Sequence, residues 1–324
     1  KINILAVQTE ADPLNGVKGD LRVYYKDIPL KDFKVVLYDD VATQLLPIID
    51  DFLAQEIDTL ICYGDYRWTY PSPSTLRVWK GNKGIIQRGQ QQLPNLQEFI
   101  FPNVASMPNT NYLSDNKSSL RKIDISNCRG TVAYLQGAQL STDLVLQGSD
   151  IADRAFYSAD IKSIDTGAYC TSIGNYAFQN SKIQSAIIGE SVSGNLGFDS
   201  FRACKFLERV TFKNTNPVDL SWGDGLIFFD CTSLQDVNFS YISAMKNNTF
   251  QNCTVLTNLT FIDKSISCDL YFGWSPVITE QSCLNIINAI ADDAKIKVQL
   301  HSTVKTQMIN NWYCKLSDGK YVAC

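Results

Sequence analysis

Adjacent carboxylates are the residues of this 324-residue chain whose spacing first suggests chemistry. Glycoside hydrolysis requires two carboxyl groups that flank one bond. Side chains adjacent in sequence rarely face the same substrate, and these pairs lie at predicted helix ends or turns, so we interpret them as solvated surface groups. The pairs are Asp39-Asp40, Asp50-Asp51 and Asp292-Asp293. Because the chain also lacks nucleophile-elbow, phosphate-loop and calcium-loop motifs, we predict no catalytic residues.

The chain contains a single histidine, His301. Most zinc sites, and most mechanisms that use a histidine base, need imidazole groups that one residue does not supply. We therefore predict no metal site and no cofactor, and we expect the protein not to be an enzyme.

Aromatic side chains are the candidates for ligand contact. Tyr66, Trp68 and Tyr70 form the densest aromatic stretch, Trp79 follows it, and Trp222 stands in an insertion. Such rings combine a large rigid area with a polar group, which suits stacking on sugar rings or peptide. The alternative is that the first four cover the apolar edge of the N-terminal region and that Trp222 packs locally.

Composition and charge exclude two classes of partner. The net charge of -4 and the pI near 5.1 give no broad positive field, so we predict that nucleic acid is not a partner. No run of about 18 apolar residues occurs, so the sequence predicts no transmembrane segment. Charged residues make up only 19% of the chain, so Ser, Thr, Asn and Gln must supply much of the polar surface.

Internal repetition indicates the elements that position these residues. Phenylalanines recur every 22 to 27 residues, each followed three positions later by a small residue. They are Phe156, Phe178, Phe201, Phe228 and Phe250. A period of roughly 20–50 residues indicates a solenoid, in which each unit buries its apolar side only against the next. We therefore predict that these phenylalanines lie directly over one another.

A short alternating motif, L-x-x-[VL]-x-F, follows the last three of these phenylalanines. It occupies residues 207–212, 234–239 and 256–261, and weaker copies begin at Leu96, Leu120 and Leu144. Alternation of apolar and polar residues is typical of a strand. We predict one strand per repeat in a stacked parallel sheet, with neighbouring strands about 4.8 Å apart.

Cysteines share one position of the last three repeats, at Cys204, Cys231 and Cys253. Ser181 and Ala159 hold the same position in earlier repeats and have no thiol for a disulfide or a metal. We therefore predict a column of small buried side chains, because free cysteine is among the most buried residue types.

Two segments, Ile173-Gly-Asn-Tyr-Ala-Phe178 and Ile151-Ala-Asp-Arg-Ala-Phe156, together with Phe-x-x-Cys and the L-x-x-[VL]-x-F motif, resemble the BspA-type leucine-rich repeat of bacterial surface proteins. The resemblance implies an α/β repeat protein: a leucine-rich-repeat solenoid with a stacked parallel β-sheet, capped by α/β segments at both ends. It also implies an exported binding or adhesion module at the cell surface, with an extracellular protein or glycan as ligand and its export signal removed. We expect a monomer.

Three regions follow from these patterns. Residues 1–87 form an N-terminal α/β cap or atypical first repeats, residues 88–262 the repeats, and residues 263–324 a C-terminal helix and strand cap. Within the first region we predict strands at residues 34–38 and 59–63, separated by a helix over residues 41–52.

The C-terminal region has its own predicted order. Its elements are a helix with Thr279 as N-cap that ends near Asp292, a strand over residues 296–300, a short helix from Ser302 and a hairpin around Asp318-Gly319. The hairpin brings Cys314 near Cys324 and permits a disulfide, but a two-residue loop pairs Cys324 with Tyr313 instead, and both alternatives stay open.

Two other functions compete with a binding module. A glycan-active enzyme or carbohydrate-binding protein with its site in the N-terminal region requires a deep pocket with a carboxylate of perturbed pKa. An architectural spacer requires a featureless surface.

Overall fold

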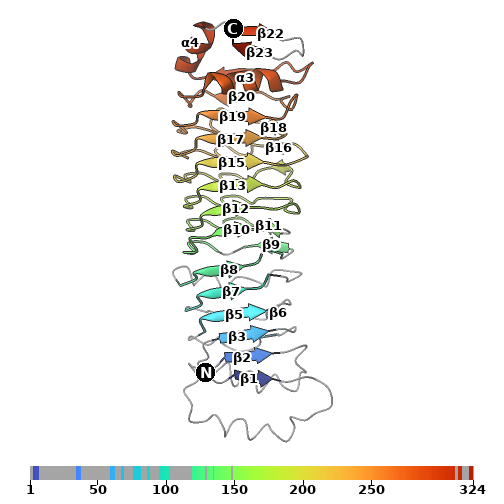
Figure 1. Ribbon diagram of the computed structural model, residues 1–324, viewed down its shortest axis with the longest axis vertical. Coiled ribbons are helices and arrows are strands. Elements are labelled where there is room, and N and C mark those ends of the chain that lie inside the picture. The colour runs from blue at the N-terminus through green and yellow to red at the C-terminus, as the bar shows by residue number, and fades with distance from the viewer. Residues whose placement is uncertain are drawn as a thin grey trace, which may run out of the picture. The chain divides into compact units, whose positions relative to one another are not determined.

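Figure 1 shows a computed structural model of the chain, which describes residues 3–6, 34–37, 59–62, 67–68, 76–81, 86–87, 95–102, 119–127, 130–133, 135–146, 149–310, 313–315 and 321–323. The chain divides into two compact units, which we describe separately. The N-terminal unit comprises Lys1–Gly130 with Ala138–Leu140, and the C-terminal unit comprises Thr131–Gly137 with Ser141–Cys324.

The N-terminal unit contains a six-stranded parallel sheet. In order, its strands are β1 (Asn3–Ala6), β2 (Lys34–Leu37), β3 (Thr59–Cys62), β5 (Val78–Gly81), β7 (Glu98–Ile100) and β8 (Lys122–Asp124). Strands β4 (Arg67–Trp68) and β6 (Ile86–Gln87) form a second parallel pair. The strands predicted near residues 34–38 and 59–63 are confirmed as β2 and β3, whereas the helix predicted over residues 41–52 lies outside the described residues.

The C-terminal unit contains a second six-stranded parallel sheet, here called the main sheet. Its strands, in order, are β10 (Asp143–Val145), β12 (Ser163–Asp165), β13 (Ser185–Ile188), β15 (Arg209–Phe212), β17 (Asp236–Phe239) and β19 (Asn258–Phe261). The motif copies that begin at Leu144, Leu207, Leu234 and Leu256 supply β10, β15, β17 and β19 of this sheet, whereas those at Leu96 and Leu120 supply β7 and β8 of the N-terminal unit. The register aligns Ala186, Val210, Val237 and Leu259 on the buried face. The predicted leucine-rich-repeat solenoid of stacked parallel strands is confirmed.

Shorter strands lie elsewhere in the coils. Strands β14 (Gly194–Asn195), β16 (Val218–Asp219) and β18 (Ile242–Ala244) form a three-stranded parallel sheet, and β9 (Gly130–Val132) pairs with β11 (Ser149–Ile151). The remaining elements are β20 (Leu270–Phe272), α3 (Glu280–Ala289), β21 (Val298–Leu300), α4 (Ser302–Asn310), β22 (Tyr313–Lys315) and β23 (Tyr321–Ala323).

The phenylalanines of successive coils form a continuous stack in the core of the C-terminal unit. Neighbouring ring centroids lie 4.9 to 5.5 Å apart, as predicted, and the rings are buried. The stack runs through Phe156, Phe178, Phe201, Phe228, Phe250 and Phe272. A second stack joins the ends of three strands through Phe212, Phe239 and Phe261.

The predicted cysteine column is also confirmed. Cys204, Cys231 and Cys253 are buried free thiols, and each donates its S–H to the carbonyl of a phenylalanine in the preceding coil. The Sγ to O distances are 2.9 Å to Phe178, 3.1 Å to Phe201 and 3.1 Å to Phe228, respectively. The thiols therefore connect successive coils.

The insertion that carries Trp222, from Pro217 to Gly225, is partly buried. Val218 and Leu220 are fully buried, and β16 joins the three-stranded sheet, whereas residues 222–224 form an exposed loop. Gly223, at φ 59°, lies against the ring of Phe198, where an added Cβ would come within 2.1 Å of the ring.

Side chains of α3 close the last strand of the main sheet, β19. Thr279 is the N-cap of α3, as predicted. The Leu259 amide donates to Ser282 Oγ at 2.8 Å, and Asn285 Nδ2 donates to the Leu259 carbonyl at 2.8 Å. Ser282 Oγ also donates to the Thr257 carbonyl at 2.9 Å. These bonds satisfy backbone groups that a free sheet edge would leave unpaired.

The terminal hairpin is present, but its register differs from the pairing of Cys324 with Tyr313 that a two-residue loop predicts. Tyr313 pairs with Ala323 and Cys314 with Val322. The side chains of Cys314 and Cys324 lie outside the described residues, and their disulfide stays a prediction.

Replacing Phe228 with Ala should lower the free energy of unfolding by about 3–5 kcal/mol, because it removes a ring from the middle of the stack and leaves a cavity. Phe206→Ala is the matched control, since that side chain is 55% exposed and its loss should change stability by no more than about 0.5 kcal/mol. Urea-induced unfolding measures both, and equal losses would contradict the stacked core.

Replacing Ser282 with Ala should cost about 1–3 kcal/mol, because the buried Leu259 amide then has no acceptor. We expect hydrogen exchange at this amide to accelerate in NMR spectra. Ser267→Ala, at an exposed position, should leave that exchange rate unchanged, and an unaffected rate in Ser282→Ala would show that α3 does not close the sheet.

Candidate functional site

The outer face of the main sheet presents side chains in two columns, because alternate residues of each strand point away from the core. The first column holds Asp143, Ser163, Ser185, Arg209, Asp236 and Asn258, and the second holds Val145, Asp165, Ile187, Thr211, Asn238 and Thr260. Ten of these twelve side chains are polar, and all are at least partly exposed.

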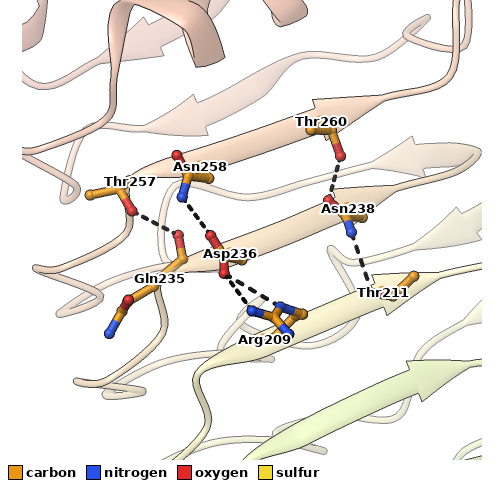
Figure 2. Close-up of polar contacts among 8 residues, drawn as sticks. All are labelled: Arg209, Thr211, Gln235, Asp236, Asn238, Thr257, Asn258 and Thr260. Atoms are coloured by element: carbon orange, nitrogen blue, oxygen red, sulfur yellow. Dashed lines mark hydrogen bonds and ion pairs between the residues drawn. The ribbon is translucent and has the colours of Figure 1, made fainter.

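Charged and amide groups bridge neighbouring strands in the first column, as Figure 2 shows. Arg209 Nη2 lies 3.2 Å from Asp236 Oδ2. The other oxygen of this carboxylate accepts a hydrogen bond from Asn258 Nδ2 at 2.6 Å. The Asp236 carboxylate thus links three strands.

A parallel ladder runs through the second column. Asn238 Nδ2 donates to Thr211 Oγ1 at 3.5 Å, and Asn238 Oδ1 accepts from the Thr260 hydroxyl (Figure 2). Because one of these contacts is exposed and the other only partly buried, each is worth about 1 kcal/mol or less. Their effect is to order the side chains rather than to stabilise the fold.

Apolar side chains accompany the ladders at one edge of the main sheet. Phe206, Val255 and Val277 occupy equivalent positions two residues before Glu208, Thr257 and Thr279, whose amides donate to the preceding coil. All three apolar side chains are exposed. We call them the apolar stripe; they lie in turns beside the polar columns.

The sequence-predicted contact residues are distributed differently. Trp79 is buried, with 1% of its surface exposed, and packs edge-on against Phe99 and Phe101. Its proposed role in ligand contact is therefore wrong, since the ring has no surface to offer a ligand. Tyr66, Tyr70 and the side chain of Trp68 lie outside the described residues and stay predictions.

Trp222 is 50% exposed at the tip of the insertion, and its role in contact stays a prediction. The structure does not bring it together with the main sheet ladder, because it follows β16 of the three-stranded sheet.

Sequence reasoning missed the ladder residues. Arg209 and Asp236 lie 27 residues apart, and their pairing becomes visible only when whole repeats are aligned with the insertion taken into account. Opposite charges at one repeat position are the signal that identifies them.

Groups with reactive chemistry are scarce in the part of the chain that the structure describes. No three His, Cys, Asp or Glu side chains there gather to hold a metal ion. Asp292 forms an exposed ion pair with Lys264 at 2.5 Å, consistent with a solvated carboxylate. Burial raises the pKa of Cys253 to about 12 and that of Cys231 well above its ordinary value, so both thiols stay protonated and unreactive.

Stacked coils with an ordered polar sheet face define a repeat scaffold of the leucine-rich-repeat class, which presents an extended surface for binding. Residues 149–272 match the family model of the BspA type leucine rich repeat region, in six copies. This part of the chain is similar to BspA-type leucine-rich repeats, as its motifs indicate, and the leucine-rich-repeat solenoid is typically a non-catalytic fold. Neither helix within the described residues has the length and apolarity needed to cross a membrane.

The chain is also similar to a solved structure, a leucine-rich repeat protein from Bacteroides ovatus. The two are 13% identical, the match covers 76% of this chain and 85% of that chain, and the TM-score is 0.38. No curated protein matches the chain.

The stability of the protein should fall as the pH rises above 9.0, because unfolded Cys253 loses its proton near that pH while the folded thiol keeps it to about 12. Below pH 9.0 both states hold the proton and the thiol adds no pH dependence. Urea unfolding across this window measures the slope. Cys253→Ser, which keeps a hydrogen-bond donor but does not titrate, should show a shallower slope, and identical slopes would contradict the assignment.

Proposed function

We propose that this chain is an exported binding module of the cell surface, which attaches to an extracellular protein through the outer face of the main sheet and catalyses no reaction. The observation that carries the proposal is the ladder of ordered polar side chains on that face. Arg209, Asp236 and Asn238 are each held by a neighbour on the next strand.

Ordered side chains favour association because less conformational entropy is lost on binding. Immobilising one flexible side chain at an interface costs about 0.5–1.5 kcal/mol. Asp236 contacts both of its neighbouring strands in the free protein. Its side chain therefore loses little further conformational entropy when a partner binds.

The apolar stripe supplies the second component of a protein interface. Stable interfaces combine apolar residues that exclude water with a polar surround. Phe206 is the largest member of the stripe and is 55% exposed, so it offers an anchor for a partner's apolar pocket.

Location at a cell surface is supported by the family, since BspA-type repeats are often surface-associated. The low charged fraction, at 19%, leaves a surface rich in Ser, Thr and Asn. We further propose that the module acts as a monomer, with one continuous face available to its partner.

The proposal predicts that the purified protein binds at least one member of a panel of extracellular-matrix proteins in biolayer interferometry. Phe206→Asp combined with Val255→Asp should weaken that binding roughly tenfold or more, because it places charges on the apolar stripe. Asn238→Arg should have a similar effect, because it disrupts the second column.

Asn195→Arg is the matched control, since it makes the same exchange at an exposed position of the three-stranded sheet. It should bind as the wild type does. The proposal fails if no matrix protein binds, or if Asn195→Arg and Asn238→Arg weaken binding equally.

A further inference from the structure

A cavity of about 380 Å³ lies between the end of β19 and the second half of α3. It is lined by Thr260, Phe261, Asp263, Asn285, Asn288 and Ala289. This volume is at the lower end of the range of small-molecule sites, roughly 300–1,000 Å³. The cavity therefore suits a ligand of one or two rings rather than a folded partner.

An aromatic ring at the end of its stack forms one wall. Phe261 stacks on Phe239 with a centroid distance of 4.9 Å. No second ring stacks on Phe261 among the described residues, and its side chain lines the cavity together with residues of α3. Phe261 is half-buried, whereas Phe272, which ends the other stack, is fully buried. The main sheet thus leaves one partly open aromatic surface, inside the cavity.

Hydrogen-bonding groups line the remaining walls. The Asp263 side chain is exposed, and its carboxylate has no hydrogen bond or ion pair with any described residue. The amide of Asn285 is held by the Leu259 carbonyl and by Gln281 Nε2 at 3.0 Å. The first bond uses one of the two N–H groups of the Asn285 amide, and the second uses one of the two lone pairs of its oxygen. One N–H donor and one lone pair of Asn285 therefore remain for a ligand.

The charge of the lining selects among ligand classes. It contains one carboxylate and no Lys or Arg, which disfavours anions such as phosphate or sulfate. Lys264, the nearest cation in sequence, is paired with Asp292. Amides, a hydroxyl and a carboxylate around an aromatic ring suit a neutral ligand with many hydroxyl groups and an apolar face.

We propose that this cavity is a saccharide-binding site, in which one pyranose ring packs its C–H face on Phe261 while its hydroxyl groups bond to Asp263 and Asn285. The site uses different residues from the apolar stripe and does not depend on a protein partner. The cavity adjoins the second column at Thr260, whereas Asp263 and Asn285 lie outside both columns.

Saturation-transfer NMR with the methyl glycosides of glucose, galactose, mannose and N-acetylglucosamine tests the proposal. At least one glycoside should receive magnetisation from the protein. Asp263→Asn should weaken its binding roughly tenfold or more, because a carboxylate accepts stronger hydrogen bonds than an amide. Asp293→Asn is the matched control, an equally exposed carboxylate outside the lining, and should bind as the wild type does.

The proposal is overturned if none of the four glycosides binds, or if Asp263→Asn and Asp293→Asn behave alike. Butylamine is included as a probe, and binding of the amine without any glycoside would show a cation site instead. The Phe206→Asp, Val255→Asp variant should keep its glycoside signal, so that failure of the sheet-face proposal and failure of this one are distinguished.

Discussion

Stacking of equivalent side chains between successive coils is the interaction on which the C-terminal unit depends. A single coil has no second layer to cover its apolar side, so burial exists only when the next coil is in place. Phe201 lies between the rings of Phe178 and Phe228. Burying such a side chain is worth about 1.5–3 kcal/mol, whereas an exposed ladder contact is worth less than about 1. The aromatic stacks therefore set the register, and the polar ladders follow from it.

This register separates the residues that determine the fold from those available for recognition. Once Val210 and Val237 are aligned on the buried face, Arg209 and Asp236 are necessarily neighbours on the outer face. The outer positions do not pack in the core, so their identities are free to suit a partner. The main sheet thereby presents ordered side chains from neighbouring strands on one face, an arrangement that suits the binding of a partner.

The parts of the structure that the sequence predicts are those with a repeated apolar signal. The phenylalanine stack, the cysteine column and the strands recur every 22 to 27 residues, and α3 begins at a recognisable N-cap. The cavity at Asp263 was not predictable, because it arises where repetition stops and a helix replaces the next strand. Trp79 was misassigned because composition alone does not distinguish a buried aromatic residue from an exposed one.

The termination of the main sheet explains why its end differs from its middle. Within the stack each ring is covered on both faces by the coils before and after it. At β19 the next element is α3, which uses Ser282 and Asn285 to satisfy the sheet edge. These side chains replace the hydrogen bonds of a further strand but supply no ring to stack on Phe261, which stays half-buried and lines the cavity. Closing the main sheet with a helix thus produces a concave, chemically mixed surface beside its last strand.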